Sequence, residues 1–232
     1  MAWNSVATLA SMVVLFVRSV LLARWLPVEV FGVYAFAASI VTLTVTIPNF
    51  GMGGAFLHRA PETEDEGQAA AVHFTLKVIL TLVWAMLLGV GALVFATGQT
   101  RTALLLLTAT TAGVGLAQTP RLILVRRVVH RRLALIQLLN VLLSTLTALG
   151  LAWRGATLWA LLSTDLVTLG LTIFALYIWR PVWRPRLAWS RPTVRYYLHF
   201  GSRTFLAGVF MRALDRVDDL WTGVFLGKTP LG

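Results

Sequence analysis

The stretch Leu158–Tyr177, LWALLSTDLVTLGLTIFALY, is almost wholly apolar and carries one carboxylate, Asp165, near its middle. A helix of about 20 apolar residues is long enough to cross the hydrocarbon core of a bilayer. A charge at the bilayer centre costs about 2.5–3.5 kcal/mol on insertion scales, so such a residue usually faces a protein interior or a water-filled cavity. An earlier apolar run, Val13–Leu26, carries Arg18 in the same way. The two charges therefore predict an interior within a membrane-embedded bundle.

The composition of the whole chain is typical of an integral membrane protein. Of its 232 residues, 58% are hydrophobic and 12% are charged, whereas soluble domains carry about 25% charged residues. The absence of cysteine excludes disulfides, thiolate metal sites and cysteine nucleophiles. The net charge of +11 does not predict nucleic-acid binding, because the basic residues lie in short loops between apolar spans, as membrane topology requires.

We predict an all-α fold, a polytopic membrane helix bundle with a six-helix N-terminal lobe and the first helix of a second lobe. The expected spans are residues 5–26, 32–56, 69–96, 102–120, 133–153, 156–179 and 204–226. The corresponding domains are 1–179, an N-terminal six-helix membrane lobe; 180–203, a basic cytoplasmic interfacial linker; and 204–232, the first transmembrane helix of a truncated C-terminal lobe. The linker is expected because 180–203 combines six arginines with tryptophan and tyrosine anchors.

The distribution of arginines predicts the orientation. With the N-terminus in the cytoplasm, the inner loops hold 12 arginines and the outer loops hold three. This bias obeys the positive-inside rule, so we expect a multi-pass protein of the bacterial inner (plasma) membrane with a cytoplasmic N-terminus.

Polar residues in five of the spans repeat at helical spacing, so that each set occupies one face of its helix. Those that carry the argument are Asn49 in the second span, Gln137 and Asn140 in the fifth, and Asp165, Thr168 and Thr172 in the sixth. Such residues can be hydrogen-bonding contacts between helices. Five polar faces in one small bundle, three of them with an ionisable group, instead favour a hydrated central cavity.

The intramembrane charges allow more than one interpretation. Arg18 and Asp165 either neutralise each other as a structural pair or serve a binding site. Lys77 can extend its ammonium toward the nearby membrane surface, and we expect His73 to be interfacial. Arg216 and Asp218 in the seventh span either line the same cavity from the second lobe or pair locally along their own helix.

The sequence lacks the motifs of common enzyme and cofactor sites. It contains no Gly-x-Ser-x-Gly, no His-Glu-x-x-His and no P-loop, and its outer loops are too short for a catalytic domain. We therefore expect no enzymatic activity, no catalytic residues, no metal site and no cofactor.

Several segments resemble a known family. Leu22–Ala35 (LARWLPVEVFGVYA) resembles the sequence that follows the first helix of Wzx-type oligosaccharide flippases, which belong to the multidrug/oligosaccharidyl-lipid/polysaccharide exporter superfamily. Asn49–Arg59, Tyr197–Gly201 and Asp218–Gly227 resemble later segments of the family, in the same order. His58 and the Trp221-Thr222 pair depart from the usual aliphatic residues.

The resemblance implies two six-helix lobes around a central cavity, of which this chain holds the N-terminal part. It implies a transporter that moves an undecaprenyl-pyrophosphate-linked glycan across the inner membrane by alternating access, for cell-surface polysaccharides such as O-antigen. The expected partners are this lipid-linked glycan, membrane lipids, and the polysaccharide polymerase and chain-length machinery.

Electrostatics suggest roles for the candidate residues. An arginine in a low-dielectric cavity attracts a pyrophosphate strongly and fits its oxygens with a planar fork, so Arg18 is the first candidate and Lys77 the second. The amide and hydroxyl side chains would bind sugar hydroxyls. Asp165 would release the anion by competing for Arg18, or would titrate in an ion-coupled step.

Two other functions stay open at this point. A cation-coupled multidrug exporter of the same superfamily would have an acidic cavity, whereas the spans before the linker carry one acid and two bases. A membrane glycan polymerase or ligase would need a large outer loop, which these spans do not leave room for.

Overall fold

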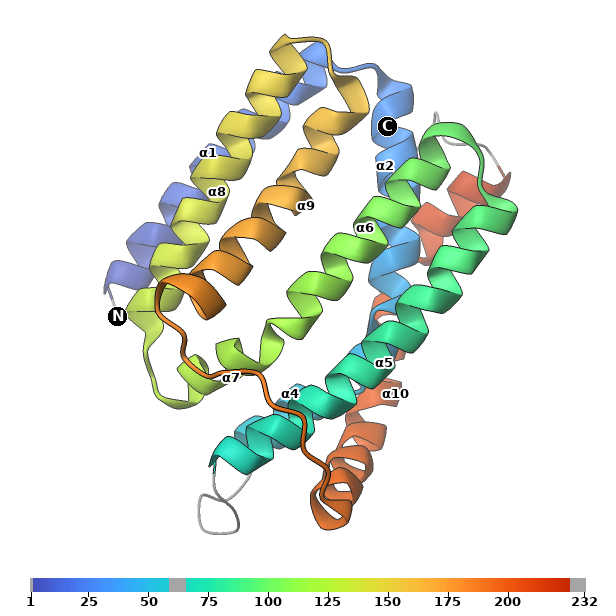
Figure 1. Ribbon diagram of the computed structural model, residues 1–232. Coiled ribbons are helices and arrows are strands. Elements are labelled where there is room, and N and C mark those ends of the chain that lie inside the picture. The colour runs from blue at the N-terminus through green and yellow to red at the C-terminus, as the bar shows by residue number, and fades with distance from the viewer. Residues whose placement is uncertain (1, 59–65, 226–232) are drawn as a thin grey trace.

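The structure, a computed structural model, describes residues 2–58 and 66–225; within them it leaves out the side chains of residues 2–8, 10, 208, 212, 213, 215–220 and 222–225. The described residues form helices and connecting segments (Figure 1). These are α1 (Ala2–Trp25), α2 (Val28–Thr44), α3 (Thr46–Asn49), α4 (Met52–His58), α5 (Glu66–Phe95), α6 (Gly98–Leu116), α7 (Gln118–Arg126), α8 (His130–Trp153), α9 (Thr157–Ile173), the π-helical turn η1 (Phe174–Trp179) and α10 (Arg191–Phe225).

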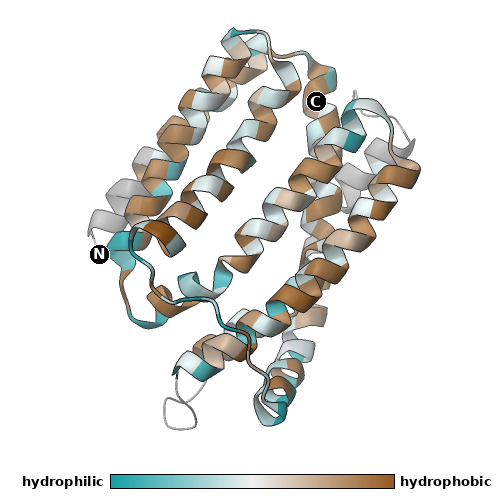
Figure 2. Ribbon diagram, in the orientation of Figure 1, coloured by the Kyte–Doolittle hydropathy of each residue, from teal (hydrophilic) through white to brown (hydrophobic). Residues whose placement is uncertain are grey.

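The prediction of an all-helical, polytopic membrane bundle is confirmed. Five helical stretches among the described residues are long and apolar enough to cross a membrane: Val28–Asn49, Glu66–Phe95, Gly98–Arg126, His130–Trp153 and Thr157–Trp179. Apolar residues cover much of these long helices, and hydrophilic residues gather at their ends and along the extended segment that leads into α10 (Figure 2).

The helices pack in two groups that meet at α6. In one group α8 lies between α1 and α9; in the other α5 packs on α6, and α10 packs on α2 and α4 (Figure 1). The groups join where α6 contacts both α2 and α9. The buried apolar core along this junction includes Val41, Trp84, Leu107 and Leu162. The junction determines where the polar faces of the helices meet.

Two of the predicted spans are interrupted, and in each a proline gives the physical reason. The span expected at 32–56 breaks after Thr44 because Pro48 has no N–H to donate to the Thr44 carbonyl. The span expected at 102–120 breaks after Leu116, whose carbonyl would need the missing N–H of Pro120. The Tyr177 hydroxyl donates to the Leu116 carbonyl instead, at 3.0 Å.

Two further expectations differ from the structure. The helix α10 begins at Arg191, so only residues 180–190 are extended, and the last part of the expected linker 180–203 is helical. The ring of His73, which was expected to be interfacial, is fully buried between helices; its depth in the membrane stays a prediction. It packs against the rings of Phe56 and Tyr197, which the turn of the chain at α4 and the approach of α10 bring to α5.

Candidate functional site

A polar cavity of about 340 Å³ lies where α3, α6, α7, α8 and α9 converge. Its wall consists of amides, hydroxyls and one guanidinium on an apolar background. The lining residues are Val45, Asn49, Thr111, Val114, Gly115, Ala117, Gln118, Arg121, Leu133, Ile136, Gln137, Asn140, Thr168, Thr172 and Leu176. Arg121, Leu133 and Leu176 place the cavity toward the end of the bundle that carries the segments 121–132 and 180–190.

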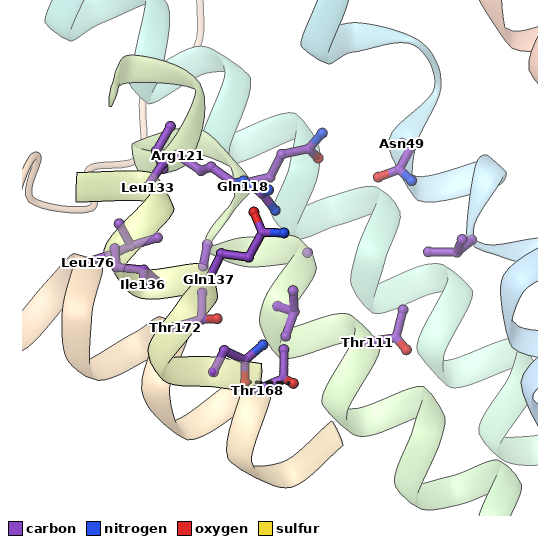
Figure 3. A pocket seen from close by; sticks show the side chains of 15 residues that line it. Asn49, Thr111, Gln118, Arg121, Leu133, Ile136, Gln137, Thr168, Thr172 and Leu176 are labelled. Atoms are coloured by element: carbon purple, nitrogen blue, oxygen red, sulfur yellow. Dashed lines mark hydrogen bonds between the residues drawn. The ribbon is translucent and has the colours of Figure 1, made fainter. Parts of the chain in front are cut away.

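Five of the residues predicted from helical spacing meet in this cavity, with Thr168 and Thr172 contributed by α9. Asn49 contributes from α3, and Gln137 and Asn140 contribute from neighbouring turns of α8. Figure 3 shows the side chain of Asn49 facing the group formed by Gln137, Gln118 and Arg121 across the cavity. The Thr168 hydroxyl of α9 donates to Asn140 Oδ1 at 3.1 Å, which holds one wall in place.

Arg121 supplies the cavity with a positive charge that the sequence did not place there. We expected Arg121 in a cytoplasmic loop, but it lies on the short helix α7, next to Gln118 on the cavity wall. Within the part of the chain that the structure describes, no ion pair of Arg121 is found. Its guanidinium is therefore available to an anionic ligand. The sequence signal was Pro120, which lies in the first turn of α7 and accompanies the helix break after Leu116.

Lys77 lies behind the cavity wall and is 1% exposed. Its ammonium donates to the Pro48 carbonyl at 3.2 Å and to Asn49 Oδ1. Lys77 packs beside Gly115 of α6, where an added Cβ would make an ordinary contact with Lys77 Cε at 3.6 Å. Lys77 does not extend to the membrane surface; it fixes Asn49 and the break that follows α3.

The break between α3 and α4 has a conformation that residues other than glycine rarely adopt. Phe50 has φ 38° and Gly51 has φ 65°, the left-handed region that is costly for a side chain with a Cβ. The Pro48 carbonyl at this break points to Lys77. Discontinuous helices whose free carbonyls bind a cation are common at the substrate and ion sites of membrane transporters.

Arg18 and Asp165 lie together but do not form a direct ion pair among the described residues. The nearest partners of the Asp165 carboxylate are the Tyr34 hydroxyl, which donates at 2.9 Å, and the Thr164 hydroxyl at 3.4 Å. Arg18 acts on the carboxylate electrostatically from α1. Neither residue lines the cavity, although Asp165 precedes the cavity residue Thr168 by one helical turn on the same face of α9.

The remaining sequence candidates, Arg216 and Asp218, have side chains outside the described residues, so their position relative to the cavity stays a prediction. Within the described residues no group of three or more His, Cys, Asp or Glu side chains could hold a metal ion.

Comparison with protein families adds an independent observation. The family model described as "Polysaccharide biosynthesis protein" matches residues 21–232. The chain belongs to the polysaccharide biosynthesis protein family. No curated protein and no solved structure matches the chain. The match covers every helix that lines the cavity.

Membership in this family supports the prediction that the protein takes part in polysaccharide biosynthesis at a membrane. A multi-pass membrane protein with apolar helices and a role in polysaccharide biosynthesis fits export of a polysaccharide precursor. Sequence reasoning missed three residues. Arg121 and Gln118 lie on α7, directly after the helix break at Leu116. Tyr34 contacts Asp165, which is 131 positions away in the sequence.

Proposed function

We propose that the protein is a flippase that moves a lipid-linked oligosaccharide across the bacterial inner membrane by alternating access. The observation that carries this proposal is the polar cavity within a bundle of membrane-length helices, in a member of the polysaccharide biosynthesis protein family. A sugar exposes many hydroxyl groups, and the amides of Asn49, Gln137 and Asn140 offer both donors and acceptors to them.

The charge of the cavity fits the anionic part of such a substrate. Arg121 lines the cavity, whereas the lining contains no acidic residue. Its planar guanidinium can bind two phosphate oxygens at once. The undecaprenyl-pyrophosphate linkage expected from the sequence is therefore the substrate group for Arg121. Arg18 and Lys77 stay candidates for later steps of its movement.

The position of the cavity fits loading from the cytoplasm. Under the orientation predicted from the arginine distribution, the segments 121–132 and 180–190 are cytoplasmic. The cavity lies toward that same end. A lipid-linked glycan assembled on the cytoplasmic leaflet would meet the cavity there, and a second lobe would complete its other wall. This function needs no bond chemistry, so we propose that the protein is not an enzyme.

The proposal is tested by complementation of a strain that lacks its own flippase for a matching glycan, with the full-length protein. We expect Gln137→Leu and Arg121→Ala to abolish surface glycan while protein abundance stays near normal, and lipid-linked glycan to accumulate on the cytoplasmic side.

The matched control for Gln137→Leu is Thr147→Val on the same helix. Among the described residues, the hydroxyl of Thr147 bonds only the carbonyls of Leu143 and Ser144 on α8, and it does not line the cavity. This control should export glycan normally. Normal export by both cavity variants would refute the proposed role of the cavity, and a wild-type chain that binds but never exports the glycan would indicate a scaffold.

A further inference from the structure

Two hollows adjoin the extended segment 180–190, away from the polar cavity. The first, about 590 Å³, is lined by Phe74, Gly113, Leu116, Ile173, Tyr177, Ile178, Pro181, Trp183, Arg184 and Pro185. The second, about 670 Å³, lies on the other side of the segment, against the first turns of α5. Pro181, Trp183 and Arg184 line both. Each is within the range of about 300–1,000 Å³ that small-molecule sites occupy.

The first hollow is an apolar trough with a cationic rim. Aromatic and aliphatic side chains from α5, α6 and η1 form its floor, and the only charged lining residue is Arg184. Arg186 lines the second hollow beside Arg184. Neither hollow has an acidic lining residue in the part of the chain that the structure describes. An apolar trough ending at two arginines is complementary to a molecule with a hydrocarbon chain and an anionic head.

The trough is already formed, because contacts at both edges fix the segment. The ring of Trp183 packs edge-on against Phe74 with centroids 5.5 Å apart. The Ala188 N–H donates to Thr75 Oγ1 at 3.0 Å. On the opposite edge the Tyr177 hydroxyl bonds the Leu116 carbonyl. A ligand that enters therefore does not have to order the segment first, which favours binding.

Exposed apolar side chains place the same segment at a membrane surface. Leu187 is 72% exposed and Trp189 is 59% exposed, and Ile178 at the mouth of the trough is 66% exposed. Tryptophan beside arginine at the end of membrane helices is typical of the headgroup layer. The trough would then open toward the acyl chains, while Arg184 and Arg186 remain level with the phosphates of the leaflet on this side of the bundle.

We infer that the trough between α5, α6, η1 and the segment 180–190 is a binding site for an anionic glycerophospholipid, with one acyl chain against Phe74 and Tyr177 and the phosphate at Arg184 and Arg186. This lipid is distinct from the transported glycan and does not enter the polar cavity. It fills the space beneath the extended segment.

The test is native mass spectrometry of the purified full-length chain with phosphatidylglycerol or phosphatidylcholine of the same acyl composition. We expect preferential retention of phosphatidylglycerol. Arg184→Gln combined with Arg186→Gln should weaken that retention by roughly 30-fold, because each basic residue near an anionic surface contributes about fivefold. The matched control is Arg24→Gln combined with Arg154→Gln, which removes two exposed arginines from the opposite end of the bundle and should retain the lipid as the wild type does.

Two further arms on the wild-type chain do not depend on how the variants fold. Inorganic phosphate and glycerol phosphate should fail to displace the lipid, because neither fills the apolar trough. Phosphatidylglycerol with a photoactivatable acyl chain should crosslink to residues that line the trough, such as Phe74, Leu116 or those within 173–185. Equal retention of the two lipids, full retention by the Arg184/Arg186 variant, displacement by inorganic phosphate, or crosslinks confined to residues outside the trough lining would each overturn the inference.

Discussion

Replacement of Lys77 by methionine tests whether a buried ammonium holds the break between α3 and α4. The side chain is 1% exposed and donates to the Pro48 carbonyl and to Asn49 Oδ1. Methionine has a similar length but no donor, so both acceptors lose their partner. A buried acceptor such as the Pro48 carbonyl costs about 1–3 kcal/mol when it is left unpaired, and the partly buried Asn49 oxygen adds a smaller loss, so the variant loses roughly 3 kcal/mol in all.

The loss is measurable as a change in the melting temperature of the detergent-solubilised protein. For chains of this size about 1 kcal/mol corresponds to roughly 2–4 °C, so Lys77→Met should melt roughly 6–12 °C below the wild type. Hydrogen exchange should rise in the segment 46–58 before it rises in α8. A melting temperature within about 2 °C of the wild type would refute the assigned role of Lys77.

Two companion variants make the test specific. Thr81→Val lies one turn farther along α5 and removes a buried hydroxyl that has no hydrogen-bond partner among the described residues. It should leave stability unchanged or raise it slightly. Asn49→Leu removes one acceptor, so its effect should not add fully to that of Lys77→Met; residues in direct contact show couplings of about 0.5–3 kcal/mol. Strict additivity would show that the two side chains do not interact.

Three further sets of variants give independent tests. Gly201→Ala should destabilise the packing of α10, because the new Cβ would lie 2.2 Å from the Phe50 carbonyl oxygen. Gly170→Ala is the control, because a Cβ at Gly170 would have no atom within 4 Å. Equal melting temperatures of the two variants would contradict the close packing at Gly201. The chain has no cysteine, so a single introduced cysteine can be labelled specifically. In spheroplasts Arg186→Cys, on the proposed cytoplasmic side, should resist an impermeant thiol reagent, whereas Arg154→Cys should react. The reverse pattern would overturn the proposed orientation. If Arg18 binds the pyrophosphate, Arg18→Ala should abolish glycan export while the protein abundance stays near normal, and Arg18→Lys should keep part of the activity. If the double variant Arg18→Ala/Asp165→Asn regains export, Arg18 has a structural role instead.

The sequence predicted the residues of the cavity that obey helical periodicity. Gln137 and Asn140 lie on one face of α8, and Thr168 and Thr172 lie on one face of α9, so spacing alone identified those faces. Length and composition likewise predicted the five helical stretches that are long and apolar enough to cross a membrane, whereas the spans expected at 5–26 and 204–226 stay predictions. These features depend only on neighbouring residues along one helix.

The features that sequence reasoning missed depend on contacts between distant segments. Tyr34 meets Asp165 across 131 positions, and periodicity within one helix holds no information about such a pair. Arg121 was assigned to a loop because the interruption at Pro120 was read as a boundary of the span, whereas the chain continues as α7 along the cavity. The burial of His73 depends on Tyr197 from α10, a helix whose start was expected later in the chain.

The ammonium at the α3–α4 break also decides what that break can respond to. In many transporters a comparable set of free carbonyls is occupied by a sodium ion or a proton, and the occupancy follows the ion gradient. Here the cation is covalently attached to α5, so its local concentration is fixed by the chain and not by the medium. It can stay on the Pro48 carbonyl only while α5 and α3 remain close enough for one lysine side chain to join them. The contact therefore couples the break to the relative position of two helices, and no ion has to be drawn from the medium to form it.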